Sequence, residues 1–353
     1  MEVKLLEILK LAALRKASDI FIVAGLALSM KIKGDIIPVT NEILKPNDTA
    51  MVIKEIYELA RNEKFDRFTK TGDADFSLPM PGIGRFRVNT YRQRGSLAAV
   101  LRVISFGLPD PEVLKIPKSV IDLHTKTKGL ILVTGPTGSG KSTTLACIVD
   151  AINMNRKGHI MTLEDPIEFL HPHKKSIVSQ REILSDTESY LRALKAAMRQ
   201  SPDVILVGEM RDYETVSIAL TAAETGQLML STLHTMGAAN TIDRIIDFFP
   251  PTHQQQIRVQ LAMTLQAVVS QQIVTTVEKG LTAAFEVMIN TTAIANMIRE
   301  GKLHQINTVM HSSGDAGMQT MDASLASLVK SGAITKETAL LYSTNPETIE
   351  RMI

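Results

Sequence analysis

The chain has 353 residues, of which 44% are hydrophobic and 22% are charged, and its net charge is +2. This balance is that of a globular protein with a core of normal size, and it gives no global reason to expect nucleic acid or an anionic membrane as a partner. The single cysteine, Cys147, excludes a disulfide within the chain and a metal site built from several cysteines. We expect its thiol to serve packing.

The first 19 residues have the spacing of an amphipathic helix and not that of a secretory signal, because Glu2 and Glu7 interrupt the apolar positions. No apolar run approaches the roughly 20 residues that a membrane-spanning helix needs. We therefore expect a cytoplasmic protein that contacts the membrane only through a partner.

Residues 1–106 have the pattern of a small α+β unit. A helix from Asn47 to about Phe68 is expected between two groups of short strands, which predicts a small antiparallel sheet with helices on one face. The expected strands cover residues 19–25, 29–39, 73–80, 84–93 and 98–104. Residues 107–118 contain three prolines and are interpreted as a linker.

Short apolar strands alternate with longer helical segments from Gly129 onward. This alternation predicts βαβ units and a mostly parallel sheet that is buried on both faces. The strands are expected at 130–135, 159–165, 203–209 and 227–234, with helices beginning at Lys141 and near residues 187, 213 and 237. After residue 250 the pattern is largely helical, with one long amphipathic segment at 254–274, a strand at 283–289 and several helices in 291–353.

The stretch GPTGSGKS at 135–142 follows an apolar strand and opens a helix, which is the context of a phosphate-binding P-loop. Its glycines allow backbone N–H groups to surround phosphate oxygens, and the helix N-terminus adds partial positive charge. Lys141 is expected to reach the β- and γ-phosphates, and the Ser142 hydroxyl is expected to bind Mg²⁺. The nucleotide-binding residues are expected to be Gly135, Pro136, Thr137, Gly138, Ser139, Gly140, Lys141, Ser142 and Thr143.

Two further strands end in acidic residues, in TLEDPIEF (162–169) and PDVILVGEMRD (202–212). Ligands bind at the carboxyl ends of parallel strands, so these acids are expected beside the P-loop. Glu209 is placed to act on Mg²⁺, directly or through a water, and either Glu164 or Asp165 is placed to be the general base. Each acid alone also fits a solvated loop. Together, two acidic strand ends beside one P-loop favour a hydrolase.

His234 follows another apolar strand, in TGQLMLSTLHT (225–235). Such a histidine is more often a satisfied core residue, but beside the other strand ends it fits a contact with phosphate or water. In RFRVNTYRQRG (85–95), Arg85 and Arg87 share one face of a strand, and Arg92 and Arg94 form a second pair. This strand is either a solvated basic edge or the source of an arginine finger.

These motifs together resemble the type IV pilus retraction ATPases, the twitching-motility branch of the secretion/pilus ATPase superfamily. The stretch GPTGSGKSTT resembles the Walker A motif, TLEDPIEF the Asp box, RQSPDVILVGEMRD the Walker B region and AETGQLMLSTLHT the His box. Shorter likenesses are ASDIFI and GRFRVN near the N-terminus, and AIANMIRE and GMQTMD near the C-terminus. The resemblance covers essentially the whole chain.

The resemblance implies an α/β fold with a PAS-like N-terminal domain (1–106) and a RecA-like P-loop ATPase domain (119–353) whose region from about 290 is helical. It implies a homo-hexameric ring that uses ATP and Mg²⁺. It also assigns roles to individual residues. Glu164 would be the catalytic glutamate, Glu209 would support Mg²⁺, His234 would carry over from the His box, and Arg85, Arg87 and Arg92, with Arg94 or Arg102, would meet the γ-phosphate.

The function implied by the resemblance is a motor that powers pilus retraction and twitching motility from the cytoplasmic face of the inner membrane. Its partners would be an inner-membrane platform protein and, as an option, a paralogous retraction ATPase. An accessory retraction ATPase is the alternative. A pilus assembly or type II secretion ATPase fits less well, since those usually carry a tetracysteine zinc site. Both Glu164 and Glu209 argue against a scaffold ring that does not hydrolyse ATP, and no acceptor site indicates a small-molecule kinase.

Two departures from the family pattern stand out. Gln227 occupies a position where the family usually has a histidine, so any role that needs protonation is weakened there. Ala295 and Met297 replace an arginine and a leucine in the C-terminal motif associated with retraction, while Arg299 and Glu300 remain.

Overall fold

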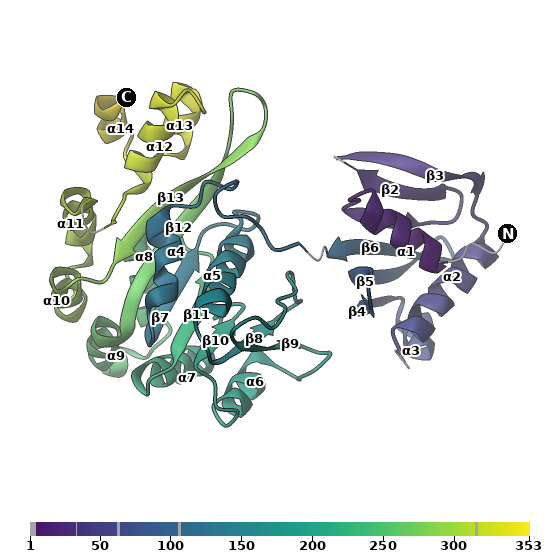
Figure 1. Ribbon diagram of the computed structural model, residues 1–353, viewed down its shortest axis with the longest axis horizontal. Coiled ribbons are helices and arrows are strands. Elements are labelled where there is room, and N and C mark those ends of the chain that lie inside the picture. The colour runs from purple at the N-terminus through teal and green to yellow at the C-terminus, as the bar shows by residue number, and fades with distance from the viewer. Residues whose placement is uncertain (1–4, 33, 62–63, 105–106, 315–316) are drawn as a thin grey trace. The chain divides into compact units, whose positions relative to one another are not determined.

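The computed structural model describes residues 5–32, 34–61, 64–104, 107–314 and 317–353 (Figure 1). The chain forms two compact units. One is Met1–Gly107 with Glu168–Leu170, and the other is Leu108–Ile167 with His171–Ile353. The domain names and boundaries given above stay predictions.

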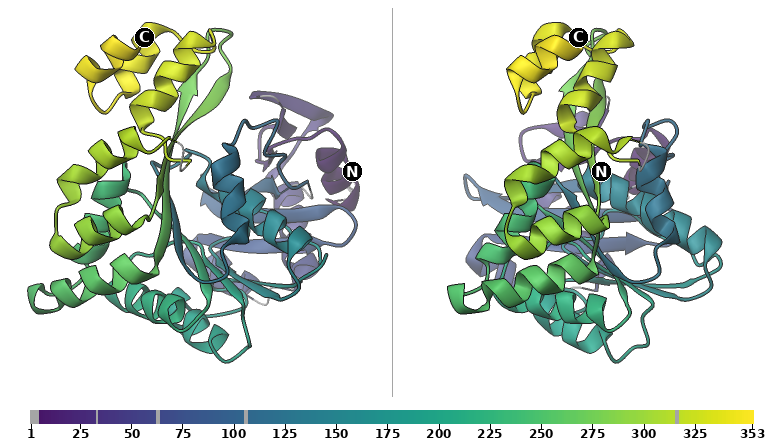
Figure 2. Two further views of the ribbon diagram at one scale, coloured as in Figure 1. Left: turned by 60° about the vertical axis from the view of Figure 1, so that its left-hand side comes forward. Right: turned by 90° about the vertical axis from the view of Figure 1, so that its left-hand side faces the viewer.

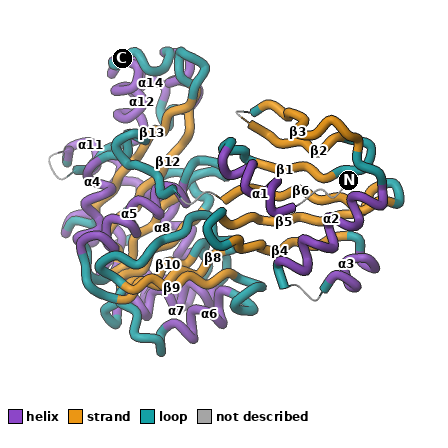
Figure 3. Tube along the Cα trace, turned by 45° about the vertical axis from the view of Figure 1, so that its right-hand side comes forward, coloured by secondary structure: helices purple, strands orange, loops and turns teal. Residues whose placement is uncertain are grey.

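The first unit is a six-stranded antiparallel sheet with helices on one face, as the sequence predicted (Figure 3). The alternation of β5 places Phe86 and Val88 in the core, where Tyr57 and Phe68 of the helices cover them. The strand order is β3-β2-β1-β6-β5-β4. The elements are α1 (Leu5–Leu14), β1 (Asp19–Ile22), β2 (Ala27–Ile32), β3 (Asp35–Ile43), α2 (Pro46–Leu59), α3 (Phe65–Thr71), β4 (Asp73–Met80), β5 (Gly84–Gln93) and β6 (Ser96–Ile104).

Two predictions in this unit were wrong because a turn was missed. The single strand expected at 29–39 is the β2–β3 hairpin, in which Ile32 pairs with Asp35 and Gly34 has a φ of +96°. Glycine adopts this left-handed conformation at low cost, as hairpin turns require. The single helix expected from Asn47 to Phe68 is α2 and α3. The ring of Tyr57 lies 5.7 Å from that of Phe68, so aromatic packing folds α3 back onto α2.

The second unit is built on a seven-stranded sheet of order β13-β12-β7-β11-β10-β8-β9. Every neighbouring pair is parallel except β12–β13, which confirms the predicted α/β class with a mostly parallel sheet. The strands are β7 (Gly129–Thr134), β8 (His159–Glu164), β9 (Ile177–Glu182), β10 (Val204–Val207), β11 (Leu228–Leu233), β12 (Leu265–Thr275) and β13 (Leu281–Ile289).

Helices cover both faces of this sheet (Figure 1). Alternate side chains of β7 face opposite layers, so Leu130 and Leu132 pack on one side and Ile131 and Val133 on the other. One side carries α6 (Tyr190–Ala197), α7 (Tyr213–Glu224), α8 (Ala238–Asp247), α9 (Pro251–Thr264) and α10 (Thr292–Glu300). The other carries α4 (Lys118–Ile121), the 3₁₀ turn η1 (Asp122–Thr125) and α5 (Lys141–Asn155).

The C-terminal helices form a small cluster of their own on the β12–β13 hairpin (Figure 2). Val274 and Ala284 of the hairpin pack against Met321 and Leu325. The Gln272 side chain of β12 also donates to the Tyr342 carbonyl at 3.4 Å. This cluster holds α12 (Met321–Lys330), α13 (Lys336–Tyr342) and α14 (Pro346–Met352), whereas η2 (Leu303–Gln305) and α11 (Ile306–Ser312) pack into the same core as α6–α10.

The long helix expected at 254–274 was wrong in its second half. The helix α9 ends at Thr264, and Leu265 begins the strand β12, which lies between β7 and β13. A strand buried on both faces shows no alternation of apolar and polar residues, so its pattern is easily taken for that of a helix. The edge strand β9 was not predicted at all.

In the part of the chain that the structure describes, no helix has the length and apolar character needed to cross a membrane.

Candidate functional site

The sequence-predicted residues of the second unit gather at one edge of its sheet. The P-loop follows β7, Glu164 ends β8, and Glu209 and His234 come just after β10 and β11. These four strands are consecutive in the sheet, in the order β7-β11-β10-β8, and every neighbouring pair is parallel, so their carboxyl ends meet at the same edge. This edge is where open α/β sheets bind their ligands.

The P-loop has the backbone geometry of a phosphate cradle. Gly140 precedes α5 with a φ of +86°. A Cβ at Gly135 would lie 2.2 Å from the Gln271 carbonyl oxygen, so only glycine fits beside β12. Lys141 Nζ donates to the carbonyls of Gly135 at 2.9 Å and Pro136 at 3.0 Å, which places its charge within the loop. The loop therefore fits a nucleotide phosphate chain.

The side chain of Gln271 on β12 forms hydrogen bonds with the P-loop and with the helix that follows it. The sequence analysis did not identify this residue. Its amide nitrogen donates to the Ser139 carbonyl, and its amide oxygen accepts from Thr144 Oγ1 at 2.8 Å. The side chain is buried, and it connects the loop with the first turn of α5. The sequence signal that could have found it is the pair of glutamines, Gln271 and Gln272, in the mostly apolar stretch LQAVVSQQIV.

Replacing Gln271 with methionine, which has a similar length but makes no such bonds, is expected to weaken ADP binding about tenfold or more. Two buried hydrogen bonds that hold the loop are lost, at about 1 kcal/mol each. Titration with ADP measures this change. Gln254→Met is the matched control, because Gln254 also donates to a backbone carbonyl, that of Phe249 at 3.2 Å. Equal affinity in both variants would contradict a supporting role for Gln271.

Glu209 lies among charged neighbours at the end of β10. Arg211 Nη2 lies 2.5 Å from Glu209 Oε1, and His234 Nε2 lies 3.5 Å from Oε2. The Glu209 side chain is 14% exposed and that of His234 is 52% exposed, so the imidazole is not a core residue. The structure thus brings Glu209 and His234 together. Arg211 lay within the GEMRD stretch but was not singled out from the sequence.

Glu164 is held at the end of β8. Thr162 Oγ1 donates to Glu164 Oε1 at 2.6 Å, and Gln180 Nε2 of β9 donates to the same oxygen at 3.3 Å. These two bonds fix the direction of the carboxylate. Neither Thr162 nor Gln180 was singled out from the sequence. Thr162 lay within the predicted strand at 159–165, and Gln180 lies on β9, a short polar strand that nothing in the sequence marks as part of the sheet.

The hydroxyl of Tyr190 lies between the ends of β8 and β10. It is 2.8 Å from the point that a Cβ on Gly208 would occupy, so Gly208 leaves room for it. Burial raises the pKa of Tyr190, and the charges of Glu209, Asp165 and Glu164 raise it further. Tyr190 is therefore a neutral hydroxyl beside these carboxylates, and the sequence analysis did not identify it.

The arginines of the first unit are distributed over both faces of its sheet. Arg85 and Arg87 share the face of β5 opposite the core, and Arg87 lies 3.5 Å from Asp75. Arg92 is on the other face and donates to the Thr69 carbonyl at 3.1 Å. Arg102 pairs with Asp19 at 3.1 Å, and Arg94, with a φ of +48°, lies in the turn after β5.

The residues that depart from the family pattern lie away from this edge. Gln227 immediately precedes β11, at the opposite end of the strand from His234, and its amide oxygen accepts from Thr225 Oγ1 at 2.9 Å. Ala295 and Met297 of α10 are partly buried and pack against the hydrophobic core on the face of the sheet that carries α6–α10.

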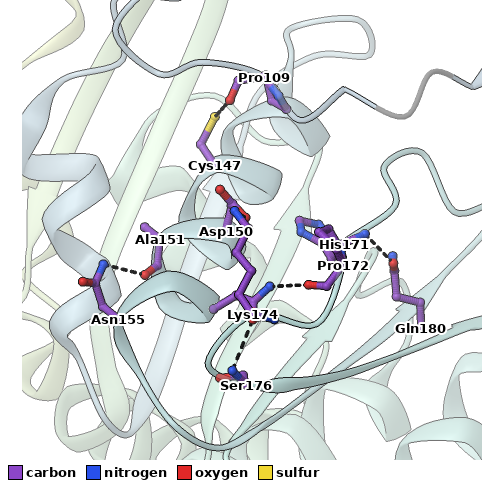
Figure 4. A network of polar contacts seen from close by, with 11 residues as sticks. Pro109, Cys147, Asp150, Ala151, Asn155, His171, Pro172, Lys174, Ser176 and Gln180 are labelled. Carbon is purple, nitrogen blue, oxygen red and sulfur yellow. Dashed lines mark hydrogen bonds and ion pairs between the residues drawn. The ribbon is translucent and has the colours of Figure 1, made fainter.

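Cys147 is buried in α5, where burial raises the pKa of its thiol to about 12. Its Sγ lies 3.5 Å from the Pro109 carbonyl (Figure 4). A protonated and buried thiol serves packing, as the sequence predicted.

Among the residues that the structure describes, no three His, Cys, Asp or Glu side chains gather in a way that would hold a metal ion. A P-loop Mg²⁺ does not need such a cage, because it is bound by one or two protein oxygens, substrate phosphates and waters. The hydroxyl of Ser142 and the carboxylate of Glu209 are oxygen donors of the required kind.

The fold and this site define a class of nucleotide-dependent secretion proteins, and the chain belongs to it. The family model of the type II/IV secretion system protein matches residues 2–314. The chain is 43% identical to the type IV pilus retraction ATPase PilT of Pseudomonas aeruginosa over 341 residues, which cover 97% of this chain and 98% of that protein.

Two further relatives agree with this placement. The type IV pilus ATPase PilU of the same organism is 41% identical over 349 residues, covering 98% of this chain and 90% of PilU. The crystal structure of the pilus retraction motor PilT with bound ADP matches with a TM-score of 0.91 at 46% identity, covering 99% of this chain and 100% of that one. The expected family, its fold and the ATPase class of enzyme are thereby confirmed.

Proposed function

We propose that this chain is an ATP-hydrolysing motor that powers the retraction of type IV pili and twitching motility. The observation that carries the proposal is the arrangement of a P-loop, Glu164, Glu209 and His234 at one sheet edge, in a chain similar to PilT over nearly its whole length. The domain interpretation belongs to the same proposal: a PAS-like domain at 1–106 and a RecA-like domain at 119–353.

In the proposed reaction the P-loop amides and Lys141 bind the phosphates of ATP. Ser142 and Glu209 would hold Mg²⁺, which would neutralise charge on the phosphate oxygens. A water attacks the γ-phosphorus, the bond to the β–γ bridging oxygen breaks, and ADP and phosphate leave. Glu164 accepts the proton of that water. His234, next to Glu209, contacts the phosphate or a water.

The proposed assembly is a homo-hexameric ring on the cytoplasmic face of the inner membrane, where it engages the platform protein of the pilus. Arg85, Arg87 and Arg92 are the candidate fingers for the γ-phosphate of another copy. A finger supplied by another subunit is worth about 10³–10⁵ in rate in other NTPases, so hydrolysis would depend on assembly.

Mixing two inactive variants tests this dependence on assembly. Arg87→Ala subunits keep their own P-loop, and Lys141→Ala subunits keep their arginines, so mixed rings are expected to regain part of the phosphate release that each variant lacks. The same mixing is done with Arg85→Ala and Arg92→Ala. Failure of every mixture to exceed the variants alone would contradict fingers supplied by another copy.

Deletion of the gene tests the biological role. Loss of a retraction motor is expected to abolish twitching and to leave excess pili on the cell surface. Normal twitching with no accumulation of pili would refute the proposal. The alternative of an accessory motor, which the similarity to PilU supports, predicts surface pili that still retract slowly through a second ATPase. A pilus assembly ATPase predicts the opposite result, with no surface pili at all.

A further inference from the structure

Thr162 and Gln180 hold the Glu164 carboxylate from one side. Thr162 and Glu164 point to the same face of β8, because side chains two residues apart on a strand share a face. In the parallel pairing of β8 with β9, Gln180 lies opposite Thr162. Both side chains donate to the same oxygen, Glu164 Oε1, at 2.6 Å from Thr162 and 3.3 Å from Gln180.

Gln180 is itself fixed by the loop that follows β8. Its amide oxygen accepts the backbone N–H of His171 at 2.8 Å (Figure 4). This bond orients the amide so that its nitrogen faces Glu164. The imidazole of His171 is half-buried, and desolvation lowers its pKa to about 4, so no charged imidazole disturbs this contact.

The same loop is fastened to α5, the helix that begins at Lys141. Asn153 Nδ2 donates to the Pro172 carbonyl at 2.7 Å, and Lys174 Nζ lies 2.6 Å from Asp150 Oδ1. Hydrogen bonds therefore connect the P-loop helix, through this loop and Gln180, with the carboxylate of Glu164.

These side-chain bonds are not required to keep β9 on the sheet. The backbone ladder between β8 and β9 already runs without interruption from His159 opposite Ile177 to Glu164 opposite Glu182. The two donors converge on one carboxylate oxygen, and the simplest consequence of this convergence is a fixed direction for that carboxylate.

We propose that Thr162 and Gln180 are positioning residues for hydrolysis, which aim the Glu164 carboxylate at the attacking water. This inference rests on the proposed role of Glu164 as the general base. A base held in one direction meets the water in the reactive geometry, whereas a rotating carboxylate does so only part of the time, and small misplacements of reacting groups cost large factors in rate. The binding of ATP does not depend on this direction.

The test measures steady-state ATP hydrolysis by the full-length protein. Gln180→Met and Thr162→Val remove one donor each while keeping side-chain size, and each is expected to lower kcat about 10- to 100-fold with KM for ATP unchanged. Thr162→Ser keeps the hydroxyl and is expected to keep most of kcat. Gln260→Met is the matched control, because Gln260 Nε2 makes the same amide-to-carboxylate bond, at 2.7 Å to Glu224, on the exposed surface.

Two outcomes overturn this inference alone. One is an inactive Glu164→Gln enzyme beside Gln180→Met and Thr162→Val enzymes of normal kcat. The other is a loss of the same size when Gln180→Met is added to Glu164→Gln, since a residue that acts through Glu164 has nothing left to position. A fully active Glu164→Gln enzyme overturns the proposed base together with this inference. Unchanged ADP binding in each variant shows that the fold is intact.

Discussion

Replacing Lys141 with alanine is expected to reduce ATP turnover by about 10²–10³ or more, because it removes the positive charge aimed at the phosphates of the nucleotide. The ammonium group lies within the P-loop, 2.9 Å from the Gly135 carbonyl and 3.0 Å from that of Pro136. Phosphate release by the assembled protein measures the loss, and a titration with ADP is expected to show weaker binding as well.

Lys302→Ala is the control for this change, since Lys302 is an exposed lysine paired with Glu300 at 2.7 Å. It removes an equal charge at a distance from the P-loop. A Lys141→Ala protein with the turnover of this control would refute the assignment of the stretch 135–142 as the nucleotide site.

Replacing Glu164 with glutamine is expected to lower kcat by about 10²–10⁴, the usual contribution of a general base. Glutamine has the same size but cannot accept the proton of the attacking water. ATP binding is expected to persist, because Glu164 ends β8 and the phosphates are bound by the loop after β7. Single-turnover phosphate release separates this loss from a loss of binding.

Asp165→Asn decides between the two acids that the sequence left open. If Asp165→Asn is the inactive variant and Glu164→Gln hydrolyses ATP normally, then the general base is Asp165. Glu300→Gln serves as the control for the removal of an acidic side chain, because Glu300 is exposed and its partner is Lys302.

The parts of the site that could be predicted from sequence were those with a fixed local context. A glycine-rich loop between an apolar strand and a helix has few alternatives, so its position on β7 and α5 followed from spacing. Acids and a histidine at strand ends were then expected together, since parallel strands bring their carboxyl ends to one edge. The 3.5 Å distance between Glu209 and His234 agrees with that expectation.

The residues that support the site could not be predicted, because their role depends on contacts distant in sequence. Gln271 reaches Thr144 across 127 positions of the chain, and the segment that contains it had been interpreted as a helix. Gln180 lies on an edge strand with too few apolar residues to show a period. Tyr190 begins a helix, and only the folded sheet places its hydroxyl beside Gly208.

The strand β12 carries two neighbouring glutamines with different tasks. Successive side chains of a strand point to opposite faces, so Gln271 faces the P-loop while Gln272 reaches the Tyr342 carbonyl of the C-terminal helices. A shift of one residue along the strand would exchange these two side chains and break both sets of contacts. Insertions or deletions between Ala267 and Gln272, where the register is regular, should therefore be absent among functional descendants of this sequence. The turn at 278–280 lies beyond the end of β12 and its side chains are exposed, so a change of length there leaves Gln271 and Gln272 in register.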